Sequence, residues 1–331
     1  MNEGHALVST LEPVLRDACR GHLSPVRWFE AIWQHGGAGT GFAEWTTGRG
    51  RTIECVVKFP VGYSEYAWTK RLGLVGEDAW DAPESVDLPT PRVLAGGFEL
   101  GSYDFAWLVM ERFPGLPLGA QTMDAGDIWS LFETTARFHA AAVLEQAVDT
   151  ERPAQAHDWP GLLERAVREM DGAYLTNGLE RWPGALARTG EVLEDLVARW
   201  NARPIDTWCH RDVHAHNAMR RAPAEGEGRG ALALIDLARV APGCWIEDAL
   251  YLERLCWGRD DVLQGVDPLT TLAKARRNLG LPAPVEDLAL ADVRRVLMAA
   301  TSPAFSRTQG DPMYLRAALE RLERLLPTVC G

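Results

Sequence analysis

A polar segment of ten residues, 208–217, constrains the fold of this chain more than any other feature of its sequence. It reads Trp-Cys-His-Arg-Asp-Val-His-Ala-His-Asn and interrupts a half of the chain in which apolar residues otherwise recur at helical spacing. Asp212 is followed five residues later by Asn217, and a second carboxylate, Asp236, ends the apolar run at 231–235. Short apolar stretches around a glycine-rich turn at 225–230 predict a compact β island within a helical region.

These residue types suit the transfer of a phosphoryl group. In such a reaction one carboxylate accepts or orients the attacking hydroxyl, and hard oxygen ligands hold magnesium against the β- and γ-phosphates. We assign Asp212 to the hydroxyl, and Asn217 with Asp236 to magnesium.

The rest of the chain predicts an α+β fold with two lobes. The N-terminal lobe, residues 1–113, is expected to be a small antiparallel sheet with a helix, and residues 114–331 a larger, mainly helical lobe. Glycine turns separate the first three expected strands, and the segment 113–117, Phe-Pro-Gly-Leu-Pro, marks the boundary. Expected strands are 26–35, 42–47, 52–59, 92–100 and 105–112, and expected helices are 11–19, 64–74, 127–144, 161–170, 191–200, 246–255 and 315–326.

In the polar segment the chain resembles the aminoglycoside phosphotransferase and choline kinase superfamily, which shares its core fold with protein kinases. His210-Arg211-Asp212 with Asn217 is similar to the catalytic loop of that family, and Asp236 to its metal-binding aspartate. The resemblance implies that Asp212 is catalytic and that His210 holds the loop through hydrogen bonds. Asp248 matches the aspartate that begins a helix in this family, and we expect it to accept hydrogen bonds from the loop backbone. His139 ends a helix that the family also carries, and we expect a structural role for it.

The resemblance extends to a nucleotide site in the N-terminal lobe. Lys58 is similar to the lysine that contacts the α- and β-phosphates, with Glu65 as its expected ion-pair partner and Glu77 as the alternative. Magnesium and ATP or GTP are therefore the implied cofactor and co-substrate. The further nucleotide-binding residues that the resemblance implies are Gly37 and Gly39 in a covering loop, and Met110, Glu111 and Phe113 in a hinge that binds adenine through its backbone.

The polar segment 208–217 departs from the family pattern in two ways. Arg211 stands where the family commonly has glycine, and both His214 and His216 are present where one histidine is expected. The residues after Asp236 also differ from the Phe-Gly of protein kinases, since they are Leu-Ala-Arg.

The sequence does not identify the acceptor molecule. The resemblance implies an aminoglycoside or another hydroxylated antibiotic, and hence antibiotic resistance, but a sugar, an amino alcohol or a natural-product intermediate fits equally well. The formal net charge of −12 favours a cationic acceptor or serves solubility alone. Four acidic residues follow the metal-binding aspartate, where such enzymes bind their substrates: Glu247, Glu253, Asp260 and Asp261.

Composition excludes several classes of partner. An acidic chain is unsuited to neutralising nucleic-acid phosphates, and no stretch approaches the length of a membrane span. The N-terminal residues are acidic and no apolar signal core follows them, so we expect a cytoplasmic protein. The sequence does not predict an oligomeric state.

Two other functions are compatible with parts of the sequence. His210, His214 and His216 lie close together and suggest a metal-dependent hydrolase, but that hypothesis leaves Lys58 and the hinge-like segment unexplained. A non-catalytic nucleotide-binding regulator is the other alternative. The presence of all the expected catalytic and nucleotide-binding groups argues against it, namely Lys58, Asp212, Asn217 and Asp236.

Overall fold

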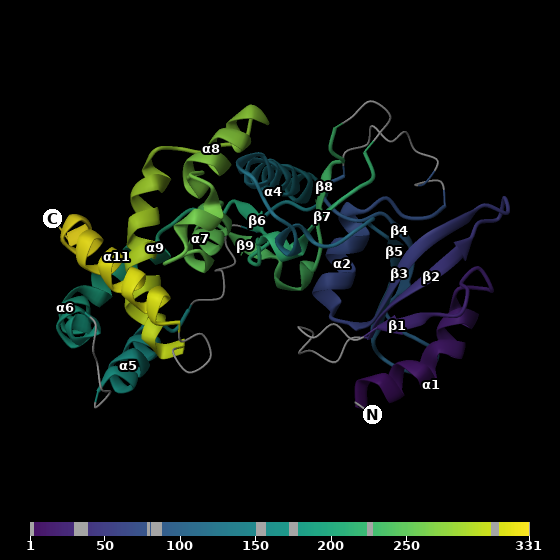
Figure 1. The fold of residues 1–331 in the computed structure, drawn as a ribbon, viewed down its shortest axis with the longest axis horizontal. Coiled ribbons are helices and arrows are strands. Elements are labelled where there is room, and N and C mark those ends of the chain that lie inside the picture. Colours follow the sequence, from purple (N-terminus) through teal and green to yellow (C-terminus); the bar gives the residue numbers. More distant parts are fainter. Residues whose placement is uncertain are drawn as a thin grey trace. The chain divides into compact units, whose positions relative to one another are not determined.

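The computed structural model describes residues 3–29, 39–77, 80, 88–149, 157–171, 178–223, 228–305 and 311–330. It confirms the predicted α+β class, with a five-stranded antiparallel sheet near the N-terminus and a larger, mainly helical region (Figure 1). The chain forms two compact units, Met1–Thr122 with Ala215–Val240, and Met123–His214 with Ala241–Gly331. The predicted lobe boundary at residue 113 stays a prediction.

The sheet of the first unit has the strand order β1-β2-β3-β5-β4. The predicted meander of the first three strands is confirmed, since β2 pairs antiparallel with both β1 and β3. Lys58 lies on the central strand, opposite Thr40 on one side and Leu108 on the other. The strands are β1 (Arg27–Phe29), β2 (Gly39–Thr46), β3 (Thr52–Val61), β4 (Val93–Gly97) and β5 (Ala106–Glu111).

The two faces of this sheet carry different helices. Cys55, Val57 and Phe59 alternate along β3 and are buried in a core that also contains Leu11 and Leu15 of helix α1 (Glu3–Ala18). Because side chains alternate across a strand, Lys58 shares the opposite face with Val56. Helix α2 (Tyr63–Leu72) follows β3 directly, and its Tyr66 packs on Leu108 and Val93.

The first unit also contains the hairpin of β7 (Ala218–Arg220) and β8 (Leu232–Leu234), preceded by the 3₁₀ helix Ala215–Asn217. Arg221 anchors this hairpin, because its guanidinium donates to both carboxylate oxygens of Glu111 and to the carbonyl oxygens of Leu88 and Thr90. The backbone N–H of Leu234 donates to the carbonyl of Pro89 at 2.8 Å. Four bonds from one planar group fix the hairpin against the end of β5.

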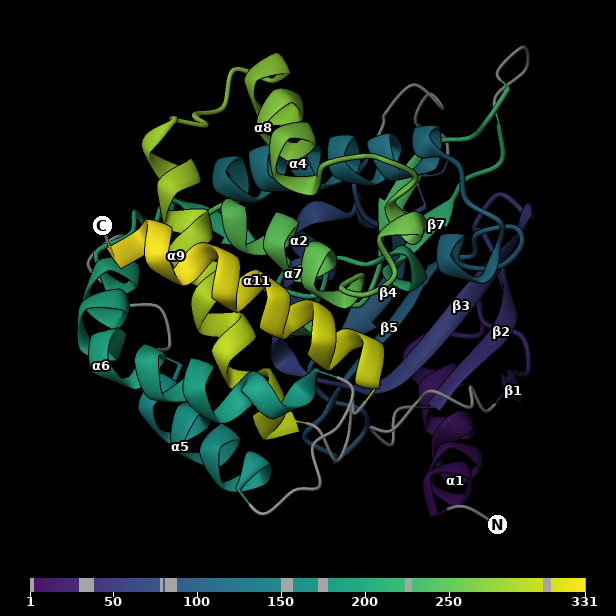
Figure 2. The ribbon, with the colours of Figure 1, turned by 60° about the vertical axis from the view of Figure 1, so that its left-hand side comes forward.

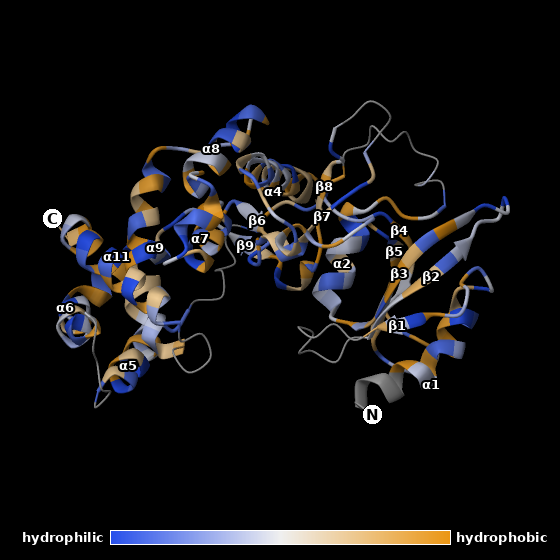
Figure 3. Cartoon of the chain, viewed as in Figure 1, coloured by the Kyte–Doolittle hydropathy of each residue, from blue (hydrophilic) through white to orange (hydrophobic). Residues whose placement is uncertain are grey.

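The second unit is built on helices around a two-stranded sheet, β6 (Thr207–Cys209) with β9 (Ala241–Gly243). In Figures 1 and 2, α9 and α11 lie side by side, and Figure 3 shows hydrophobic and hydrophilic residues alternating along α11. The stripe Leu315, Leu319, Leu322 and Leu326 is buried, as expected for core residues. The main helices are α4 (Ala125–Glu145), α5 (Trp159–Met170), α6 (Trp182–Asn201), α7 (Ile246–Leu255), α8 (Pro268–Asn278), α9 (Glu286–Thr301) and α11 (Pro312–Cys330).

Four helices differ markedly from the sequence prediction, and the first of them, α1, begins at Glu3 and not at residue 11. Helix α6 begins nine residues earlier than expected, with Pro183 in its first turn, where a missing N–H is harmless. Helices α8 and α9 were not predicted, although Asp267 caps α8 by accepting from the N–H of Thr270 at 2.7 Å. Among the helices that the structure describes, none has both the length and the hydrophobicity to cross a bilayer.

Candidate active site

One buried carboxylate organises the polar segment in the second unit. Asp248, near the start of α7, accepts hydrogen bonds from the backbone N–H groups of His210 (2.9 Å) and Arg211 (2.7 Å). It also bonds the imidazole of His139 at 2.8 Å, and both side chains are fully buried. The predicted role of Asp248 as acceptor for the loop backbone is therefore confirmed, as is the structural role of His139.

The protonation of His139 follows from its second partner. A guanidinium can only donate, so Nδ1 of His139 accepts from Arg276 Nη1 at 3.0 Å and Nε2–H donates to Asp248. Burial lowers the pKa of His139, which agrees with this neutral tautomer. Burial alone would raise the pKa of Asp248, but the hydrogen bond from His139 and that from the N–H of Arg211 outweigh it, so the carboxyl stays ionised.

Arg211 adopts a left-handed backbone conformation, with φ of 63°. Glycine takes this conformation without cost, whereas a residue with a Cβ is strained there. The left-handed backbone therefore suits the glycine that the resemblance led us to expect at this position. The two hydrogen bonds to Asp248 compensate the strain, and the Arg211 side chain extends to within 3.7 Å of Glu247.

Asp212, the predicted catalytic residue, accepts a hydrogen bond from the hydroxyl of Tyr251 on α7. His214 Nε2 lies 3.7 Å from the same carboxylate oxygen. Sequence reasoning missed Tyr251, although a signal was present. It follows Asp248 by three residues, and side chains three apart share one face of a helix.

In the first unit, Lys58 forms an ion pair with Glu65 of α2, and Lys58 Nζ lies 3.9 Å from Asp236 Oδ1. The open question of its partner is thereby settled in favour of Glu65. Burial raises the pKa of the Glu65 carboxyl, and the ammonium of Lys58 offsets only part of that rise. Glu77 instead accepts hydrogen bonds from the indole of Trp45 (3.0 Å) and the N–H of Gly48 (2.8 Å).

Asn217 and Asp236 lie at the same end of the β7–β8 hairpin. The carbonyl of Asn217 accepts from the N–H of Ile235 at 2.9 Å, directly beyond the pair Ala218 and Leu234. Asp236 has a φ of 63°, which is strained for a residue with a side chain. An amide and a carboxylate oxygen beside a lysine form a donor set of hard oxygen atoms, which is the type that magnesium prefers. The chemistry of these residues therefore fits the implied metal.

The structure describes all but one of the other predicted nucleotide-binding residues. Gly37 lies outside the described residues, and Gly39 begins β2, where a Cβ would come within 2.2 Å of Val8 Cγ1. Met110 pairs with strands on both sides, Glu111 is the partner of Arg221, and Phe113 is buried. Their contribution to nucleotide binding stays a prediction.

Three of the four acidic residues proposed for the substrate have an arginine partner, and two of these three are buried. Glu247 is buried and accepts from Arg203 Nε at 3.0 Å. Glu253 is buried and binds Arg295 through both carboxylate oxygens. Asp260 and Asp261 are exposed, and Asp260 accepts from Arg321 at 3.1 Å. A cationic acceptor would have to displace arginine from buried Glu247 and Glu253, whereas Asp260 and Asp261 are exposed to solvent.

The arrangement of His210, His214 and His216 does not support the hydrolase hypothesis. Among the described residues, the group close enough to share a metal ion is His139, Cys209 and Asp248, and it includes none of the three histidines that hypothesis needs. Both ring nitrogens of His139 already have partners, and burial raises the pKa of Cys209, which keeps the thiol protonated. We interpret this group as a hydrogen-bond network.

A sequence model of the phosphotransferase enzyme family matches residues 76–280 of the 331-residue chain. The chain belongs to the phosphotransferase enzyme family. The predicted phosphotransferase activity is thereby confirmed, and the match supports a small-molecule phosphotransferase. A comparison with curated proteins found no match.

Solved structures with the same fold include several kinases. An aminoglycoside phosphotransferase from Alicyclobacillus acidocaldarius is 17% identical, with a TM-score of 0.52, over 93% of this chain and 92% of the other. A microcompartment-associated aminopropanol kinase is 14% identical, with a TM-score of 0.57, over 96% and 98%. An AMP-bound spectinomycin phosphotransferase is 11% identical, with a TM-score of 0.50, over 93% and 97%. These likenesses confirm the kinase-like fold.

The buried neutral His139 predicts that the protein loses stability in mild acid. Unfolded histidine has a pKa of about 6.5, and the folded value is lower, so below about pH 6.5 the unfolded state binds more protons and the free energy of unfolding falls. Denaturant unfolding at pH 8 to 5 should show a constant value above pH 7 and a decline below pH 6.5, with a slope up to about 1.4 kcal/mol per pH unit for each such histidine.

The variant His139→Gln should be less stable at pH 7 and should lose part of this slope. His157, whose pKa burial and the charge of Arg294 lower to about 4, contributes in the same pH range, so His157→Gln should also lose part of the slope and separates the contributions of the two residues. A free energy of unfolding that does not change between pH 7 and pH 5 would contradict the assignment of a neutral His139.

Proposed function

We propose that this protein transfers the γ-phosphate of a magnesium-bound nucleoside triphosphate, ATP or GTP, to a hydroxyl group of a small molecule. The observation that carries the proposal is the cluster of Lys58, Glu65 and Asp236 in the first unit. A lysine fixed by one carboxylate and lying 3.9 Å from a second is suited to neutralising phosphate charge beside a metal ligand.

In this proposal the first unit binds the nucleotide. Lys58 neutralises charge on the phosphates, and Glu65 holds the ammonium in place. Asn217 and Asp236 supply oxygen ligands from one end of a hairpin that Arg221 anchors. Magnesium, when bound there, would reduce the repulsion between the phosphates and the attacking oxygen.

The second unit provides Asp212, which accepts or orients the proton of the acceptor hydroxyl. Tyr251 donates to its carboxylate and so restricts the direction in which Asp212 points. Asp248 fixes the backbone immediately before it. His210 acts through the loop backbone and is a positioning residue in this proposal.

Support for a small hydroxylated acceptor comes from the names of the structural relatives, which cite aminoglycosides, spectinomycin and aminopropanol. The AMP-bound relative supports a nucleotide co-substrate. An antibiotic, a sugar, an amino alcohol or a natural-product intermediate is compatible with the proposal. Glu247 and Glu253 support a cationic acceptor less than their sequence positions suggested, since arginines already bind both.

The function predicts that nucleotide binding depends on magnesium. ATP or GTP should raise the melting temperature clearly with magnesium and only weakly with EDTA, because Asn217 and Asp236 bind the nucleotide through the metal. Nucleotide consumption with a panel of hydroxylated acceptors should likewise require magnesium. Asp236→Asn should weaken the magnesium-dependent shift, whereas Asp17→Asn, an exposed aspartate on α1, should not. Binding and turnover that are indifferent to EDTA would refute the proposed roles of Asn217 and Asp236.

Asp212→Asn should fold normally and bind magnesium-nucleotide with unchanged affinity, while kcat falls by about 10²-fold or more, the scale of general-base catalysis. The amide keeps the shape of the side chain but cannot accept the proton. Turnover and nucleotide-induced thermal shift are measured on one preparation.

Tyr251→Phe is the companion variant, because it removes the hydrogen bond and keeps the carboxylate. It should lose much less activity than Asp212→Asn. If Asp212→Asn keeps near-normal turnover, the residue is not catalytic; if it loses nucleotide binding as well, Asp212 is a metal ligand instead.

A further inference from the structure

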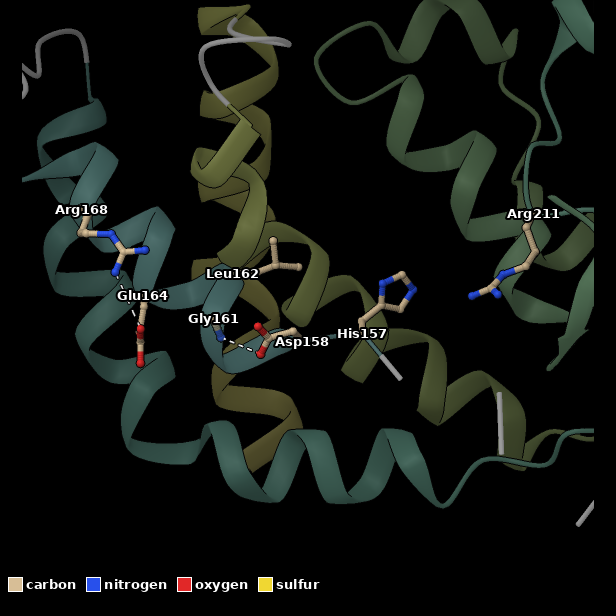
Figure 4. A pocket seen from close by; sticks show the side chains of 7 residues that line it. All are labelled: His157, Asp158, Gly161, Leu162, Glu164, Arg168 and Arg211. Atoms are coloured by element: carbon tan, nitrogen blue, oxygen red, sulfur yellow. Dashed lines mark hydrogen bonds and ion pairs between the residues drawn. The ribbon is translucent and has the colours of Figure 1, made fainter. Parts of the chain in front are cut away.

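A cavity of about 590 Å³ opens in the second unit between the start of α5 and the catalytic segment. Its size is within the usual range for small-molecule sites. In Figure 4, the guanidinium of Arg211 extends toward His157, and Glu164 and Arg168 lie further along α5. The residues that line it are His157, Asp158, Gly161, Leu162, Glu164, Arg168 and Arg211.

The cavity adjoins the residue that precedes the proposed catalytic aspartate in the chain. Arg211 lines the cavity and directly precedes Asp212, and consecutive Cα atoms are about 3.8 Å apart. The fixed backbone of Arg211 holds its side chain at this wall. In the proposal developed below, a molecule that extends from the cavity to the next residue presents a hydroxyl to Asp212 and another group to Arg211.

An excess of positive charge lies at this wall. The carboxylate of Glu247 accepts from Arg203 Nε at 3.0 Å and lies 3.7 Å from Arg211 Nη2. The charge of Glu247 also acts on a third guanidinium, that of Arg294, together with the charges of Arg203, Arg211 and Arg254. At least three cations thus share one buried anion.

Arg294 shows the effect of this crowding. Burial and the charges of Arg203 and Arg211 lower its pKa to about 10, although Glu247 opposes that shift. Its guanidinium stacks on the rings of Trp159 and Trp200 and lies 3.3 Å from His157 Nε2. Among the described residues, no hydrogen-bond acceptor reaches Arg294 Nη1, which is shielded from solvent.

The lining itself carries two carboxylates, Asp158 and Glu164, and two guanidiniums, Arg168 and Arg211, so the excess of positive charge comes from Arg203 and Arg294, which do not line the cavity. Asp158 caps α5 by accepting from the N–H of Gly161 at 3.0 Å. Glu164 lies 3.7 Å from Arg168 one helical turn away, so each of these charges offsets the other. The excess near Arg211 stands out in a chain with a net charge of −12. Grouped cations that are partly removed from water are costly unless an anion joins them.

We propose that this cavity binds an anionic group, a carboxylate or a phosphate, carried by the acceptor molecule. The inference rests on the proposed function, since it assigns the substrate class of the same site. Arg211 and Arg168 are the guanidiniums at the cavity wall, and Arg294, whose guanidinium lies 3.3 Å from His157 Nε2 of that wall, adds to the positive potential. The acceptor is then a hydroxy acid or a phosphorylated alcohol, and not a polycationic aminoglycoside.

The test compares acceptors that share a hydroxylated skeleton and differ in charge. Glycerol, glycerate and glycerol 3-phosphate are assayed for phosphorylation, with ethanolamine and kanamycin as cationic acceptors. A charge-assisted hydrogen bond changes binding by about tenfold to a hundredfold, so kcat/KM for glycerate or glycerol 3-phosphate should exceed that for glycerol by at least about tenfold. Preference for one of the two anions identifies the carboxylate or the phosphate as the natural group. Equal or better use of glycerol, ethanolamine or kanamycin overturns the proposal.

Substitutions on α5 and α9 test whether the preference for anionic acceptors comes from this cavity. Arg168→Gln should raise KM for the preferred anionic acceptor by about tenfold with little change in kcat, because a guanidinium lost at the wall weakens binding. Arg165→Gln is the matched control, since Arg165 is also exposed on α5 but does not line the cavity. Arg294→Gln should act like Arg168→Gln, and Arg294→Lys, which keeps the charge, should restore part of the affinity. An equal effect of Arg165→Gln and Arg168→Gln overturns the assignment.

A binding measurement separates this inference from the proposed function. Inorganic phosphate and malonate, compared with chloride at equal ionic strength, should raise the melting temperature of the wild type and not of Arg294→Gln. If the anions bind in this way but no acceptor is phosphorylated, the anion site stands and the proposed function fails. If acceptors are phosphorylated but neither anion stabilises the protein, the function stands and the anion site is wrong.

Discussion

The buried carboxylate of Asp248 is the constraint on which the candidate site depends. It accepts from two consecutive backbone N–H groups, those of His210 and Arg211, and from the imidazole of His139. These bonds compensate its desolvation and hold Arg211 in a left-handed conformation that a non-glycine residue avoids. Asp212 follows immediately, so these bonds fix the backbone directly before the proposed catalytic side chain. Arg276 completes the arrangement by fixing the tautomer of His139.

Local patterns in the sequence predicted those parts of the structure that local interactions determine. The alternation around Lys58 placed it correctly on the face shared with Val56, and the expected helix 246–255 coincides with α7. Glu65 was identified because it begins the helix after the lysine strand. Contacts between distant segments were not predictable. Arg276 meets His139 across 137 residues of sequence, on a helix that was not expected at all.

The acidic residues after Asp236 also show that partners distant in the sequence could not be predicted. Glu247 and Glu253 were assigned to the substrate because of their charge and position, yet both are buried against arginines. One sequence does not reveal which face of α7 packs inward, and charged residues on that face must be paired. Their pairing also changes the expected acceptor. Arg203, Arg211 and Arg294 act together with the one carboxylate of Glu247, and on this we base the proposal of an anionic acceptor where composition had suggested a cation.

The most direct test of this account is the turnover of Asp248→Asn, measured with its magnesium-nucleotide affinity and its free energy of unfolding. The account predicts a folded but less stable protein that binds nucleotide normally, because the nucleotide residues belong to the first unit. Its kcat should fall by about 10²-fold, since a displacement of about 1 Å at the reacting groups has an effect of that size. The amide protons of His210 and Arg211 should also exchange faster. A folded variant with near-normal kcat would contradict the claim that this carboxylate positions the catalytic residue.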